Sequence, residues 1–142
     1  MDFPHRPYRP VLVSVETVAA LAEIHPESVV YMCEAGAYRW AWDFGTGDRR
    51  EIRIWVGEVM SRSHAGLPLT DVLRRVIGHE TEPLLRASTV CAMFAVPHPT
   101  IHRLVAAGQL RGPLDSNIQW ITRASLQEFL TRRLLEPEPS LK

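Results

Sequence analysis

The strongest constraint on the fold is an internal repeat: one segment occurs twice, 72 positions apart, so that residue 17 aligns with residue 89. The two segments are TVAALAEIHPESVVYMCEAGAYR (17–39) and TVCAMFAVPHPTIHRLVAAGQLR (89–111). Their identical pairs include Gly36 with Gly108, and conservative pairs fall at apolar periodic positions. Because the matches follow the helical apolar period and share a terminating glycine, we expect one structural unit to occur twice.

Each segment predicts two short helices that are joined by a tight turn. In the second segment Ile101, Leu104 and Val105 form an apolar stripe at helical spacing. Pro99 suits the first turn of this helix because its missing N–H is no loss there, and Gly108 suits the helix end.

A strand-like pattern follows each helix pair. In the first copy aromatic residues alternate along 40–44, which predicts a half-buried strand with core-filling rings, and a Gly-rich turn leads to a return strand. The distance from the glycine to the return strand is 18 positions in the first copy (36 to 54) and 13 in the second (108 to 121). A further helix follows each hairpin, and Thr122 is the expected N-cap of the second one. The expected unit is therefore helix, turn, helix, hairpin, helix.

This pattern divides the chain into five parts. They are a flexible arm (1–10), copy one with the long hairpin (11–62), a linker (63–84), copy two (85–135) and a flexible tail (136–142). The linker carries an apolar stripe that predicts one connecting helix, with Thr70 as its N-cap and Gly78 at its end. The expected fold class is α+β, mostly helical, with two tandem modules and a connecting helix.

Composition limits the class of protein. Hydrophobic residues make up 46% and charged residues 23% of the chain, which is typical of a globular protein. We find no apolar run long enough for a membrane span and no signal-peptide core, so we expect a soluble, cytoplasmic protein. Cys33 and Cys91 are expected to be buried thiols. No phosphate loop, metalloprotease motif or nucleophile elbow occurs, so we expect neither catalysis nor a cofactor.

The charge balance is informative about partners. The 16 basic and 16 acidic residues cancel, which counts against a simple nonspecific attraction to nucleic acid. All basic residues except Lys142 are arginines, the side chain best suited to phosphate groups and guanine edges. The second half of the chain is the more basic one.

Residues 88–130 combine an apolar first helix, Val96 before the turn, the second helix TIHRLVAAGQL, and an aliphatic return strand that enters a Leu/Phe helix. With these features they resemble the excisionase and MerR-type winged helix-turn-helix family. Residues 15–60 resemble the same module with a longer wing. The family implies two winged helix-turn-helix modules and a role in DNA binding, either in transcription control or in recombination.

The resemblance places the DNA-binding face of copy two on its second helix and wing. The residues that would contact DNA there are His98, Thr100, His102, Arg103, Arg111 and Asn117. The alternative is an ordinary solvated helix face. His98 and His102 are also spaced for a metal ion, but no third ligand is near in the sequence, so no metal site is expected.

Copy one departs from this pattern because its second helix shows Glu27, Tyr31 and Glu34 on the equivalent face, and glutamates repel phosphate. Its arginines could compensate, and the candidates for DNA contact are Arg39, Arg49, Arg50 and Arg53. An equally good alternative pairs the wing arginines with the acids of the same hairpin, Asp43, Asp48 and Glu51.

The sequence thus favours a sequence-specific binder of double-stranded DNA, as a transcriptional regulator or an excisionase-like accessory factor. The alternative is a protein-interaction scaffold on the same modules, with a protein partner on the acidic face of copy one. Neither interpretation requires a membrane, and neither sets an oligomeric state.

Overall fold

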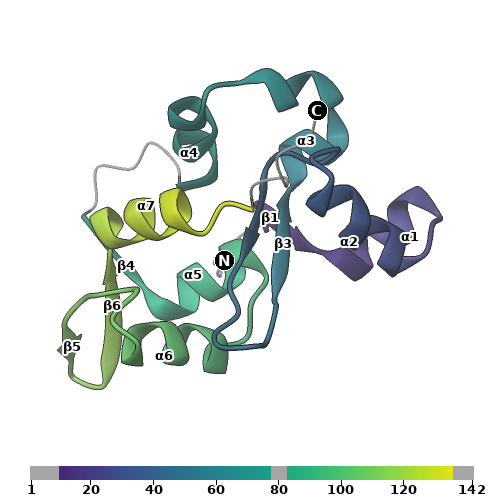
Figure 1. Cartoon of the computed structure of the whole chain (residues 1–142). Coiled ribbons are helices and arrows are strands. Elements are labelled where there is room, and N and C mark those ends of the chain that lie inside the picture. Colours follow the sequence, from purple (N-terminus) through teal and green to yellow (C-terminus); the bar gives the residue numbers. More distant parts are fainter. Residues whose placement is uncertain (1–9, 78–82, 136–142) are drawn as a thin grey trace, which may run out of the picture.

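The computed structural model describes residues 10–77 and 83–135, so residues 1–9 of the arm, the tail (136–142) and residues 78–82 of the linker lie outside the described residues. The fold is α+β, with two small three-stranded antiparallel sheets among short helices (Figure 1). The coarse fold class predicted from the sequence is therefore confirmed.

Copy one and copy two contain the same elements in the same order. Copy one comprises β1 (Leu12–Ser14), α1 (Val15–Ala22), α2 (Pro26–Glu34), β2 (Ala41–Asp43), β3 (Ile52–Trp55) and α3 (Val56–Met60). Copy two comprises β4 (Leu84–Arg86), α5 (Ala87–Phe94), α6 (His98–Ala106), β5 (Leu114–Asp115), β6 (Ile118–Thr122) and α7 (Arg123–Arg132). A 3₁₀ helix (Arg62–Gly66) and α4 (Leu69–Ile77) connect them.

The structural repeat follows the sequence repeat closely. β4, α5 and α6 each begin 72 positions after β1, α1 and α2, so the matching helix pairs that the sequence predicts are present. The residue after the first helix is left-handed in both copies, with φ 56° at Glu23 and 54° at Ala95. α7 begins 67 positions after α3, which confirms that the hairpin of copy two is five residues shorter.

The expected unit omitted one element, the strand before each helix pair. Each sheet has the return strand of its hairpin in the centre, in the orders β1-β3-β2 and β4-β6-β5. Leu12 lies opposite Trp55, and Leu84 lies opposite Thr122. The unit is therefore strand, helix, turn, helix, hairpin, helix.

Local capping explains where the helices begin. The Ser14 side chain accepts a hydrogen bond from the Thr17 amide, and Thr122 accepts one from the Ser125 amide, as predicted for Thr122. Pro99 lies in the first turn of α6, also as predicted. The N-cap expected at Thr70 is wrong, because α4 begins at Leu69 and contains that residue, and the predicted end at Gly78 lies outside the described residues.

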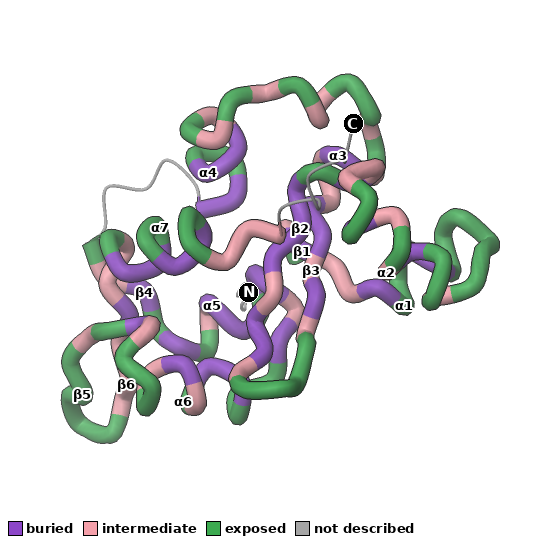
Figure 2. The backbone as a smooth tube through the Cα atoms, viewed as in Figure 1, coloured by how far each residue is buried: buried purple, intermediate pink, exposed green. Residues whose placement is uncertain are grey.

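One of the two core clusters of the described residues contains buried side chains from both copies, and Figure 2 shows buried positions along the elements of each copy. The Phe44 ring lies 5.4 Å from that of Phe94 and 5.1 Å from that of Phe129, so an aromatic residue of copy one packs between two helices of copy two. The indole N–H of Trp42, a buried side chain, donates to the Leu130 carbonyl at 2.8 Å. The tryptophans of the first hairpin thus fill the core rather than stack on a ligand.

Backbone contacts also join the copies. After α7, the Arg133 carbonyl accepts from the Asp43 amide at 3.1 Å, and the Leu135 amide donates to the Ala41 carbonyl at 2.8 Å. The residues that follow α7 therefore extend the first sheet along the outer edge of β2.

Two further sequence expectations can be compared with the described residues. Cys33 and Cys91 are buried and unpaired, as expected. In the described ranges, none of the helices has the length and apolar character needed to cross a membrane.

Candidate functional site

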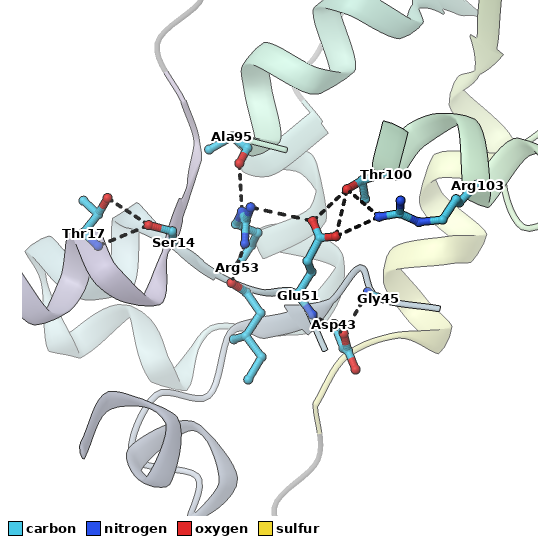
Figure 3. Close-up of polar contacts among 10 residues, drawn as sticks. Ser14, Thr17, Asp43, Gly45, Glu51, Arg53, Ala95, Thr100 and Arg103 are labelled. Atoms are coloured by element: carbon cyan, nitrogen blue, oxygen red, sulfur yellow. Dashed lines mark hydrogen bonds and ion pairs between the residues drawn. The ribbon is translucent and has the colours of Figure 1, made fainter. Parts of the chain in front are cut away.

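The polar side of α6 is divided into an edge that faces copy one and an edge that faces solvent. Thr100 lies on the first edge and is 1% exposed. Its hydroxyl oxygen lies 2.8 Å from both carboxylate oxygens of Glu51, to which it donates (Figure 3). Arg103, which is partly exposed, donates to the same carboxylate at 3.2 Å. Thr100 is therefore an interior residue, not part of the exposed helix face that the sequence led us to expect.

Glu51 lies between two arginines, since Arg53 approaches its other oxygen at 3.8 Å. The Arg53 guanidinium also donates to the Ala95 carbonyl at 2.9 Å and to the Ile52 carbonyl at 3.0 Å. Burial lowers the pKa of Arg53, and the charge of Glu51 opposes that shift. Arg53 thus belongs to the contact between the copies, and the structure does not place it on a surface available to DNA.

The other wing arginines of copy one lie on the surface of its hairpin. Arg50 pairs with Glu34 at 2.6 Å and approaches Asp43 at 3.9 Å, so the ion-pair alternative describes Arg50 as well as Arg53. Arg49 is exposed. The hairpin keeps its shape because the Asp43 carboxylate accepts from the Gly45 and Glu51 amides, at 2.8 and 2.9 Å.

Two further candidates, Arg39 and Arg111, occupy equivalent positions but different surroundings. The guanidinium of Arg39 lies 4.8 Å from the Trp40 ring centre and donates to the Ala65 carbonyl. Arg111 is half-exposed and pairs with Glu128 on α7 at 2.9 Å. That hydrogen bond and the positive charge of Arg111 lower the pKa of the Glu128 carboxyl. Both arginines are exposed at the surface, and each is engaged by a neighbouring group of the same chain.

The solvent-facing edge of α6 borders a hollow of about 240 Å³ between this helix and the β5–β6 hairpin. It is lined by Arg86, Ala87, Ser88, His98, His102, Asn117, Ile118 and Gln119. The lining includes several hydrogen-bond donors and no carboxylate. The two histidine rings lie 6.4 Å apart, one helical turn from each other.

The hairpin places Asn117 at the hollow through its two-residue tip. Ser116 and Asn117 have φ values of 49° and 66°, the paired left-handed conformations that a tight type I′ turn requires. Asparagine tolerates this conformation better than most residues do. Gly112 is required because a Cβ there would lie 1.9 Å from the Trp120 carbonyl oxygen.

Sequence reasoning missed three polar residues of the hollow: Arg86, Ser88 and Gln119. Arg86 and Ser88 flank the start of α5, and Arg86 ends the strand β4 that the expected unit lacked. The Arg86 guanidinium lies 5.5 Å from the Trp120 ring centre. The available signal was the match of LLR (84–86) to LVS (12–14) at the repeat spacing, just before each helix pair.

No group of three or more metal-ligating side chains gathers within the described ranges, so His98 and His102 have no third ligand there. A comparison of the chain with known protein families, curated proteins and solved structures finds no match.

Proposed function

We propose that the chain binds double-stranded DNA through copy two, which acts as a winged helix-turn-helix module with α6 as the recognition helix and β5–β6 as the wing. The observation that carries the proposal is the hollow between these two elements, which presents donors from both and contains no acid. A duplex presents phosphates beside base edges that accept hydrogen bonds, so a donor-rich surface suits both.

The roles of individual residues follow from their exposure. His98 and His102 face solvent on α6 and would contact base edges or phosphates, and Arg103 retains partial exposure at the side of the same face. Arg86 and Asn117 would contact the backbone on either side of the groove. The proposal retains the role of transcriptional regulator or excisionase-like accessory factor.

Copy one has a supporting role in this proposal. Its equivalent helix α2 exposes Glu27, Tyr31 and Glu34, which gives a surface that phosphate disfavours. Glu51 bonds Thr100 and Arg103 from the opposite side, so the hairpin of copy one holds α6 in a fixed orientation. A fixed recognition helix loses less conformational entropy when it binds.

The test is fluorescence anisotropy with labelled random-sequence duplexes, followed by selection of bound sequences. The triple variant Arg86→Ala/His98→Ala/His102→Ala should reduce the affinity at least ~tenfold, because contacts to charged groups contribute about 1.5–3 kcal/mol each. The matched control is Arg75→Ala, which removes an exposed cation from α4, an element far from α6 in Figure 1.

The salt dependence adds an independent criterion. Loss of the Arg86 contact to a phosphate should flatten the slope of log affinity against log salt by about 0.9. Absence of duplex binding by the wild-type chain at roughly 50 mM salt would refute the proposal. Equal affinities of the triple variant and Arg75→Ala would remove the hollow from the interface.

A further inference from the structure

The repeat places two equivalent surfaces on the molecule, one at the helix–turn–helix corner of each copy. In copy two the corner residues Met93 and Val96 are 8% and 5% exposed. The equivalent residues of copy one, Leu21 and Ile24, are 62% and 38% exposed. The same apolar corner is thus covered in one copy and open in the other.

Copy one supplies the cover for the corner of copy two. The Val11 amide, just before β1, donates to the Met93 carbonyl at 2.7 Å. The Arg53 guanidinium donates to the carbonyl of Ala95, the left-handed residue after α5, at 2.9 Å (Figure 3). β1 also lies against α5, and Val11 packs on the shared core. The covering group is therefore an extended backbone segment beside an arginine.

The open corner of copy one has the same backbone geometry. Glu23 has φ 56° and ψ 45°, against 54° and 41° for Ala95, so its carbonyl is presented in the same way. The surrounding charge differs, because exposed Glu23 and Glu27 replace Ala95 and Pro99. The span 15–34 carries no lysine or arginine of its own. A cationic side chain is therefore favoured there even more than in copy two.

We infer that this open corner, formed by Leu21, Glu23, Ile24, Glu27 and the exposed Tyr31, binds another protein through an extended segment that carries arginine. The segment repeats the contact within the chain: a backbone N–H donates to the Leu21 carbonyl, and a guanidinium binds the Glu23 carbonyl and the nearby carboxylates. Apolar side chains of the same segment cover Leu21 and Ile24. This inference does not depend on DNA binding by copy two.

A second copy of this chain does not fit as the occupant through the same contact. The position of copy two that corresponds to Val11 is Pro83, which has no N–H to donate. The position that corresponds to Arg53 in strand register is Trp120, since Ser14 pairs with Arg53 and Arg86 pairs with Trp120. Copy one's own Val11 and Arg53 are already engaged within the chain. None of these described segments of a second copy can repeat the contact, so the proposed occupant is a different protein.

The test uses the full chain, labelled with ¹⁵N, and a short peptide of alternating valine and arginine as the probe. Binding should shift the amide signals of the corner, and the double variant Leu21→Ser/Ile24→Ser should raise the dissociation constant at least ~tenfold, because it exchanges apolar contact for hydroxyl groups. Met60→Ser is the matched control, since Met60 is an exposed apolar residue on α3, and it should change the constant less than ~twofold.

Two further measurements separate this inference from its competitors. Glu23→Gln should weaken binding of the arginine peptide, and a peptide of alternating valine and glutamate should not bind. Equal binding of both peptides, or shifts confined to copy two, would overturn the inference. So would self-association through this corner, seen as a concentration-dependent mass in sedimentation that Leu21→Ser/Ile24→Ser abolishes.

Discussion

Replacement of Glu51 should destabilise the contact between the copies. Glu51→Ala leaves the Thr100 hydroxyl, which is almost fully buried, without its acceptor, and this costs about 1–3 kcal/mol. Loss of the partly exposed pair with Arg103 adds about 0–1 kcal/mol. The half-buried Arg53 keeps its two carbonyl acceptors but loses its nearest negative charge. The two quantified losses together lower the free energy of unfolding by about 1–4 kcal/mol.

Urea unfolding followed by tryptophan fluorescence measures this loss, and the melting temperature should fall by roughly 3–12 °C at about 3 °C per kcal/mol. Glu51→Gln keeps an oxygen acceptor for Thr100 and should cost about half as much. A double-mutant cycle of Glu51→Gln with Thr100→Val should give a coupling of at least ~0.5 kcal/mol. The control is Asp48→Ala, an exposed acid of the same hairpin, which should stay within about 0.5 kcal/mol. Additive effects in the cycle, or equal costs for Glu51→Ala and Asp48→Ala, would refute the reasoning.

Three further predictions concern the core, the thiols and the recognition helix. Phe44→Ala should lower the free energy of unfolding by about 3–5 kcal/mol. Because the two copies share this core, circular dichroism and fluorescence should still report a single coincident unfolding transition. Two separated transitions would contradict this prediction. Burial raises the pKa of the Cys33 thiol to about 12 and that of Cys91 to about 11. Both thiols should therefore stay protonated and unreactive to a disulfide reagent at pH 8 until urea unfolds the chain. Rapid reaction of the native protein would show that the thiols are accessible. If the exposed part of the Arg103 side chain reads a guanine, Arg103→Ala should weaken duplex binding by about 1–3 kcal/mol. The same change should cause a small loss of stability, because it removes the contact with Glu51. Unchanged binding would assign Arg103 to that contact alone.

The sequence repeat predicted the helix pairs, the hairpins and the difference in hairpin length, because each depends on local apolar spacing and on glycine positions. It did not predict β1 and β4, since a strand of three residues is too short to show a period. It also could not assign Thr100 to the interior. Threonine at that position fits a solvated helix face equally well, and only the position of Glu51, 49 residues earlier, decides the matter.

Sequence reasoning also treated the two copies as separate modules and so could not foresee which corner is covered. Met93 and Leu21 are both large apolar residues at matching positions, and their different exposure results from the packing of one copy on the other. The difference becomes visible only when Val11 and Arg53 are placed against Ala95 and its neighbours.

The strand-like segment after α7 has a consequence for the order of folding. Trp42 and Leu134 form a bridge across 92 positions, so closing that loop costs about 4 kcal/mol of chain entropy before the contact stabilises anything. Until Leu134 and Leu135 have been synthesised, the outer edge of β2 presents unpaired backbone groups, the arrangement through which strand edges of different molecules associate. The sheet that begins first along the chain is therefore the one completed last, and a nascent chain is most prone to aggregate during that interval.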